Sequence, residues 1–312
     1  MPLPLIPIIL GGASALAATH GVKKGVEAKQ DMDLANSINN EAQDIAQKAE
    51  KKIEKSKEKT TKSIEALGAQ KIEILSGTVN DFVTTFEKIK NIQFFDTQGL
   101  DELKYFDPQS PEFLQLKQIS MEAKDVAVNG ISALGSLTGV AATNATLAWL
   151  GGGALSVGGL GMVGGMAVLG GIVAGPALAL GGSLFAKQAD KAYWDAKSNL
   201  EKAETFKEQA EDIHTTLKAI KERADQLKQL LIDLDEPFEQ LNADMRMIVK
   251  NNGTDWNTYK NTDKTKIYKC VQVAQVVKMV LDTSLLTEDG KLQRQSKKAL
   301  TEGNKFLESL NE

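Results

Sequence analysis

The sequence predicts an all-α protein, arranged as an elongated antiparallel helical bundle or coiled-coil stalk with a glycine-rich apolar helical hairpin at one end. No segment alternates apolar and polar residues for long enough to indicate a β-sheet. Aromatic residues make up only 5% of the 312 residues, and the abundant Ala, Leu, Lys, Glu and Gln are typical of long helices. Apolar residues recur at steps of three and four over long segments, as in coiled coils.

Residues 1–19 form the first segment, an apolar N-terminal arm without charge. Ala15-Leu16-Ala17 has the small-x-small form of a cleavage site, but no Lys or Arg precedes the apolar run, so secretion by a signal peptide is not expected. The run is also short for a full bilayer span. Three roles stay open for the arm: lying against the hairpin, inserting beside it, or filling a groove of the core.

Residues 20–125 are expected to form a long helix and a linker of the stalk. The chain contains no proline from His20 to about Lys90. A thin heptad-like seam runs through this part, formed by Ile38, Ala42, Ile45, Ala49, Ile53, Ser56, Thr60, Ile64, Leu67, Lys71 and Ile74. Gly99, Pro108 and Pro111 mark a loop, after which a second helix leads into the next segment.

Residues 126–186 contain no Asp, Glu, Lys or Arg over about 61 positions, and hold about 16 of the 26 glycines. We call this segment the ion-free stretch. Residues 131–150 and 166–186 each match the length of a bilayer span of ~20 residues, with a glycine-rich turn between them. Charged residues flank the stretch on both sides while the turn has none, so both ends can stay on one side of a membrane.

Insertion of this hairpin is marginal for one chain, since its apolar side chains contribute only a few kcal/mol before glycine and proline are counted. Small-x-x-x-small patterns let helices approach closely in a bilayer, so oligomerisation is expected to accompany insertion. The residues expected to insert or to pack helices there are Gly135, Gly139, Trp149, Gly161, Gly165, Gly171, Gly175, Pro176 and Phe185. Ser, Thr and Asn in the first half suit a water-filled lumen or interhelical hydrogen bonds equally.

A soluble alternative places the ion-free stretch inside a helical bundle, where small residues permit tight packing. Each glycine destabilises a helix in water by about 1 kcal/mol relative to alanine, so a soluble bundle built on these glycines would be destabilised. The membrane interpretation is therefore preferred.

Residues 187–250 are predicted to form a coiled-coil return helix with the most regular apolar spacing in the chain. Its seam residues include Ile213, Leu217, Ile220, Leu227 and Leu231. Pro237 is expected to end or kink this helix. Residues 251–312 are predicted to form C-terminal helices that pack on the stalk, one over about 262–286 and a short amphipathic one after Gly290.

Enzymatic motifs are weak, and no enzyme activity, cofactor or metal is expected. Residues 159–164 match G-x-G-x-x-G, but no strand precedes them. Two histidines are too few for a histidine-based metal site, and Cys270 lacks a recognisable base. A net charge of −4 gives no reason to expect a nucleic-acid partner.

Long solvated helices over 41–90 and 187–234, with an apolar hairpin between them that carries Ile172-Val173-Ala174-Gly175-Pro176, resemble the organisation of α-helical pore-forming toxins of the cytolysin A and haemolysin BL type. The resemblance implies an apolar element that is packed away in the soluble form and inserts as the protein oligomerises.

The expected function is that of a membrane-associated homo-oligomer that permeabilises or remodels a lipid bilayer through its apolar hairpin. A non-lytic membrane-anchored scaffold is the alternative. In that case the coiled-coil stalk recruits a protein partner.

Overall fold

The computed structural model describes residues 22–92, 108–125, 127, 192–287 and 290–310. The chain divides into two compact units. Unit 1 comprises residues 1–59 and 169–218, and unit 2 comprises residues 60–168 and 219–312. Each unit is described by itself below.

Helices account for nearly all of the described chain, which confirms the all-α class. They are α1 (Val22–Ile74), the π-helix η1 (Leu75–Val79), α2 (Asn80–Phe86), α3 (Pro111–Asp125), α7 (Ala192–Asn252), the 3-10 helix η6 (Trp256–Thr258), α8 (Asn261–Asp282) and α9 (Arg294–Leu310). Within the described residues, extended pairing is limited to isolated bridges such as Lys90 with Asp255.

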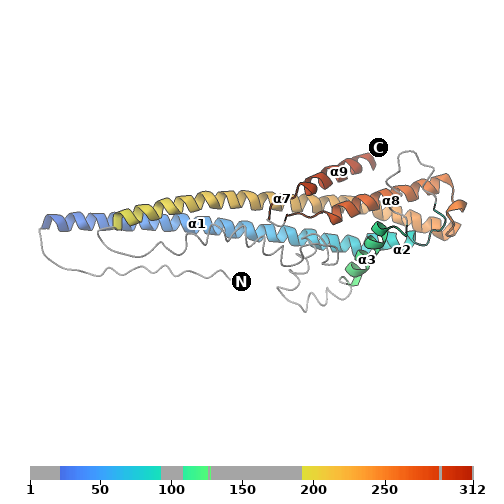
Figure 1. Ribbon diagram of the computed structural model, residues 1–312, viewed down its shortest axis with the longest axis horizontal. Coiled ribbons are helices and arrows are strands. Elements are labelled where there is room, and N and C mark those ends of the chain that lie inside the picture. The colour runs from blue at the N-terminus through green and yellow to red at the C-terminus, as the bar shows by residue number, and fades with distance from the viewer. Residues whose placement is uncertain (1–21, 93–107, 126, 128–191, 288–289, 311–312) are drawn as a thin grey trace. The chain divides into compact units, whose positions relative to one another are not determined.

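In unit 1, α1 and α7 run side by side in the same direction (Figure 1). Three contacts fix their register: Asn199 donates to Asn39 at 3.0 Å, Lys52 pairs with Glu211 at 2.5 Å, and Ser56 bonds to His214 at 2.6 Å. The sequence separations of these pairs are 160, 159 and 158. A nearly constant separation is the signature of a parallel pair, because in an antiparallel pair the sum of the residue numbers stays constant instead.

Unit 2 shows the same direction, so the predicted antiparallel arrangement of these two helices is wrong. Asn242 donates to the Thr78 carbonyl and Arg246 pairs with Asp81, at separations of 164 and 165 residues. The Lys90–Asp255 bridge beyond them is also parallel. Two helices joined by a short turn must run antiparallel. Here residues 75–191 separate α1 from α7, so no short turn constrains the direction of α7.

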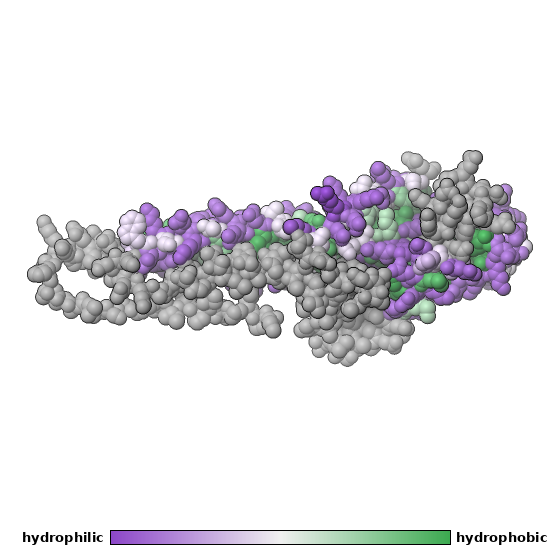
Figure 2. All heavy atoms as spheres, viewed as in Figure 1, coloured by the Kyte–Doolittle hydropathy of each residue, from purple (hydrophilic) through white to green (hydrophobic). Residues whose placement is uncertain are grey.

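The two units differ in what fills the α1–α7 seam. The seam of unit 1 is built largely from small or polar buried residues, among them Ala35, Ala42, Ala49, Ser56, Ala196, Asn199, Ala203 and Ala210. The seam of unit 2 buries large apolar side chains, among them Ile64, Leu67, Ile74, Ile220, Leu227, Leu231, Leu234 and Phe238. On the face drawn in Figure 2, hydrophilic side chains cover most of the described helices and apolar ones show only between them.

Two further helices complete unit 2. α8 returns antiparallel along α7, with Lys266 paired to Asp244 at 2.9 Å and Cys270 bonded to Asn242. α9 lies along α7, where a Cβ placed on Gly303 would stand only 2.6 Å from Leu230 Cδ2. This close approach lets the buried small residues of α9 reach the surface of α7.

The sequence predicted that α7 ends or kinks at Pro237. The helix does not end there and continues to Asn252. A proline inside a helix costs roughly 3 kcal/mol because one backbone donor is lost and the ring crowds the preceding turn. Leu234 and Phe238 on either side are fully buried. Their burial offsets that cost.

Candidate functional site

The ion-free stretch, from which the functional expectation came, lies outside the described residues except for Ala127. So do all nine positions expected to insert or pack in a membrane, from Gly135 and Gly139 through Trp149, Gly161, Gly165, Gly171, Gly175 and Pro176 to Phe185. Among the described helices, none combines the length and apolar character that crossing a membrane requires. The described residues nearest to the stretch along the chain are those of the two flanking helices, and each helix is considered within its own unit.

α3 precedes the ion-free stretch and is held in unit 2 by an aromatic cluster, which we define as Phe82, Phe86, Phe113 and Phe238. Phe82 lies 5.2 Å from Phe86, 6.3 Å from Phe113 and 5.6 Å from Phe238, measured between ring centroids. All four rings are at most 1% exposed. Such tilted and offset contacts add to the burial of the rings. The cluster therefore fixes α3 to the segment that follows α1 and to α7.

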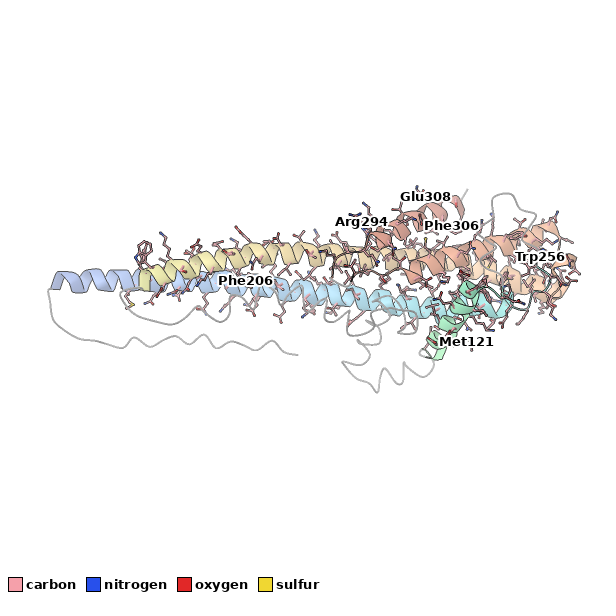
Figure 3. The ribbon with its side chains drawn as sticks, viewed as in Figure 1. Met121, Phe206, Trp256, Arg294, Phe306 and Glu308 are labelled. Atoms are coloured by element: carbon pink, nitrogen blue, oxygen red, sulfur yellow. The ribbon has the colours of Figure 1, made fainter. Side chains whose placement is uncertain are left out.

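Two polar contacts fix the rotation of α3 about its axis. Lys117 pairs with Glu87 at 2.5 Å, and Lys124 donates to the Asn80 side chain at 3.1 Å. On the outer face, Leu114 and Met121 are 51% and 54% exposed (Met121 in Figure 3). α3 is thus apolar on two sides, one buried in protein and the other turned to solvent just before the ion-free stretch begins.

On the other side of the ion-free stretch, α7 begins in unit 1 with an aromatic pair, the half-buried Tyr193 and the exposed Trp194. Trp194 is 69% exposed, the highest value among the large apolar side chains that the structure describes. The ring of Tyr193 meets it edge-on at 5.6 Å, and Lys197 Nζ lies 5.8 Å from the Trp194 ring centroid. Trp and Tyr are enriched where proteins meet the membrane–water interface, because one part of each ring is apolar and another is polar.

The coiled-coil seam residues named from the sequence are all buried along α7. Ile213 and Leu217 lie in unit 1, where Ile213 is 7% exposed and Leu217 fully buried. Ile220, Leu227 and Leu231 lie in unit 2 and are fully buried. These residues serve packing between helices and leave little surface for recognition.

His214 takes part in a polar layer of the unit 1 seam that the sequence did not indicate. Ser56 Oγ donates to the Lys52 carbonyl at 2.7 Å and lies 2.6 Å from His214 Nδ1. The serine and the imidazole are thus joined by a hydrogen bond across the seam. The salt bridge between Lys52 and Glu211 lies on the same turns. The histidine is half-buried and helps to set the register of the helix pair.

Lys71 is the most unusual charged group in unit 2. Only 2% of it is exposed, and its Nζ donates to the Leu281 carbonyl at 2.8 Å and to the Thr283 carbonyl at 3.3 Å. These carbonyls belong to the end of α8, where backbone acceptors lack helical partners. Burial lowers the pKa of Lys71 from 10.5 to about 8, against the opposing effect of Asp282. The only indication in the sequence that Lys71 is buried was its position in the apolar seam.

Cys270 is buried in unit 2 and its Sγ donates to Asn242 Oδ1 at 3.2 Å. Burial raises the pKa of this thiol, so the nucleophilic thiolate is disfavoured. Among the described residues, no cluster of three or more His, Cys, Asp or Glu side chains has the geometry to hold a metal ion.

Comparisons with protein-family models, with curated proteins and with solved structures found no match.

Proposed function

We propose that this protein is a membrane-inserting, oligomer-forming helical protein that permeabilises or remodels a lipid bilayer through residues 126–186. The observation that carries the proposal is the absence of ionisable side chains over about 61 consecutive residues. Hydrocarbon excludes charge at a cost of about 2.5 to 3.5 kcal/mol per residue at the centre of a helix. A segment free of that cost is suited to lipid.

The flanking helices support the proposal from both sides of the stretch. Leu114 and Met121 expose apolar surface on the helix that enters it, and Trp194 and Tyr193 stand at the start of the helix that leaves it. Trp and Tyr are enriched where membrane proteins meet the lipid–water boundary. Each pair lies within a short distance along the chain from the ion-free stretch, where a membrane-bound segment would meet water.

A non-lytic scaffold is the second candidate. The α1–α7 pair presents a largely polar exterior that suits a protein partner, while the apolar segments would hold the chain to the lipid. The two functions differ in one observable. Both predict binding to vesicles, but only the first predicts release of their contents.

Two lysines placed in the second half of the ion-free stretch, Val173→Lys with Leu180→Lys, are expected to abolish vesicle leakage in the full-length protein. Together they add roughly 5 to 7 kcal/mol to the cost of insertion, more than the apolar gain of that segment. The measurement is dye release from vesicles of phosphatidylcholine and phosphatidylglycerol, run beside flotation of the same samples. The matched control, Val173→Ile with Leu180→Ile, should leak as the wild type does.

Flotation of the wild type without dye release would favour the scaffold. A wild type that neither floats nor releases dye would contradict both candidates. Circular dichroism of each variant shows whether the helices outside the stretch keep their structure.

A further inference from the structure

Within unit 2, a π-helix interrupts the helix that runs from α1 into α2. This segment, η1, covers Leu75–Val79, and in a π-helix each backbone N–H reaches a carbonyl five residues back instead of four. α3 packs on this segment. π-helical turns are rare and often lie at functional positions. The segment that carries α3 is thus the least regular part of the helix beneath it.

The facing part of α7 is also irregular. Pro237 has no backbone N–H, so one hydrogen bond of the helix is missing near this level. Asn242 joins the two helices, because its side-chain amide donates to the Thr78 carbonyl at 2.9 Å. Cys270 of α8 in turn donates to Asn242 Oδ1 at 3.2 Å. Polar side chains therefore help to hold η1 on α7.

Asp235 is the titratable group at this contact. Its side chain is half-buried and forms a hydrogen bond with the side chain of Thr78, within η1. The Oδ1 atom of Asp235 is buried and has no hydrogen-bond donor among the described residues. The charged groups that act on this carboxyl are Glu73 of α1 and Glu239 of α7, and no described lysine or arginine is among them. A carboxylate is unfavourable in such surroundings, because burial costs most for a charged group that lacks partners.

Burial raises the pKa of the Asp235 carboxyl above its ordinary value of 3.8, and Glu239 and Glu73 raise it further. The hydrogen bond with Thr78 acts in the opposite direction. Because the pKa is higher in the folded state, the folded protein keeps this proton at a pH where the unfolded chain has lost it. The stability that this group contributes is fully present below the unfolded pKa and is lost as pH rises through the folded pKa.

We propose that Asp235 forms a proton-dependent contact in unit 2: its neutral form holds η1, and with it α3, firmly on α7, and its ionised form loosens that contact. The inference does not depend on the membrane function proposed above, because it rests on the contacts of unit 2 alone. Its consequence is that α3, the helix before the ion-free stretch, is held more firmly in acid than at neutral pH.

The test measures amide hydrogen exchange of the full-length protein between about pH 4 and about pH 7, with each rate divided by the intrinsic rate at the same pH. Protection of the η1 amides in the wild type is compared with that in Asp235→Asn, whose side chain stays neutral throughout. The ratio of wild-type to variant protection should fall as pH rises, by up to about tenfold for each unit by which the pKa of Asp235 is raised. Amides of α3 should follow those of η1.

The matched control is Glu236→Gln, which removes an exposed carboxylate from the same helix. The ratio of wild-type protection to that of this control should stay constant over the same range. When Asp235→Asn is compared with Asp235 in a background of Glu73→Gln with Glu239→Gln, the fall should be smaller. It should remain detectable, because burial is the largest cause of the raised pKa.

A ratio for Asp235→Asn that stays flat would overturn the inference, and so would an equal fall in the Glu236→Gln control. Protection that changes in η1 but not in α3 would overturn the link to α3. If Asp235→Asn does not fold, NMR titration of the Asp235 carboxyl carbon in the wild type gives the answer. A midpoint above the ordinary value of about 3.9 supports the inference, and a midpoint at or below it overturns the inference.

Discussion

Replacing Phe82 with alanine is expected to lower the free energy of unfolding of unit 2 by about 3 to 5 kcal/mol. Phe82 is fully buried and contacts three other rings of the aromatic cluster. Its removal takes away apolar burial and leaves a cavity that the rigid helix pair cannot close. Because the cluster also holds α3, hydrogen exchange in α3 should accelerate together with that in α2.

Urea unfolding followed by circular dichroism, with hydrogen exchange to locate the change, measures this effect. Phe206→Ala is the matched control, because Phe206 lies on α7 in unit 1 and is only half-buried (Figure 3). It should cost much less than Phe82→Ala. A loss below about 1 kcal/mol for Phe82→Ala would show that the cluster does not anchor α3.

Replacing Lys71 with methionine is expected to change how stability depends on pH. Burial lowers the pKa of Lys71 in the folded protein to about 8, from an ordinary value of 10.5. Between these two values the unfolded chain still binds the proton that the folded chain has released. The folded state therefore gains stability as pH rises through this window. Below about pH 8 the lysine is charged in both states, and the cost of burying the charge is fully present.

The gain across the window is on the order of 3 kcal/mol, at 1.36 kcal/mol for each pKa unit. The measurement is the difference in free energy of unfolding between wild type and Lys71→Met, at several values from pH 7 to pH 10.5. Taking the difference removes the titration of other groups, including the Cys270 thiol. The wild type should gain on the variant as pH rises, while the exposed Lys250→Met should follow the wild type. A flat difference for Lys71→Met would contradict the buried position of the ammonium group.

The periodicity of the sequence was enough to predict the helices and their buried faces. Leu227 and Leu231 stand at steps that only a helix places on one side, and both are fully buried. The break near Asn91 and the start at Pro111 also follow from local chemistry, since proline is favoured in the first turn of a helix.

The direction of α7 relative to α1 could not be predicted in the same way. A heptad seam is compatible with either direction, and the 117 residues from 75 to 191 that separate the two helices allow both. The contacts that fix the direction, such as Asn39 with Asn199, are short polar pairs between distant residues. No local pattern in the sequence indicates them.

The roles of Lys71 and Trp194 were missed for related reasons. The seam position of Lys71 was visible, but its acceptors are backbone carbonyls more than 200 residues away, at separations of 210 and 212. The seam residues named from the sequence begin at Ile213, although buried Ala196 and Asn199 continue the seam toward the start of α7. The exposure of Trp194 becomes evident only once those two residues are known to face α1.

The alanine, serine and asparagine seam of unit 1 has an energetic consequence. A buried alanine contributes one methyl group where a buried leucine contributes four carbons, at about 0.8 kcal/mol for each buried carbon group. Parting the helices over residues 35–56 therefore costs far less than parting them over residues 64–74. Local separation of α1 from α7 is therefore expected to occur more readily in unit 1 than in unit 2.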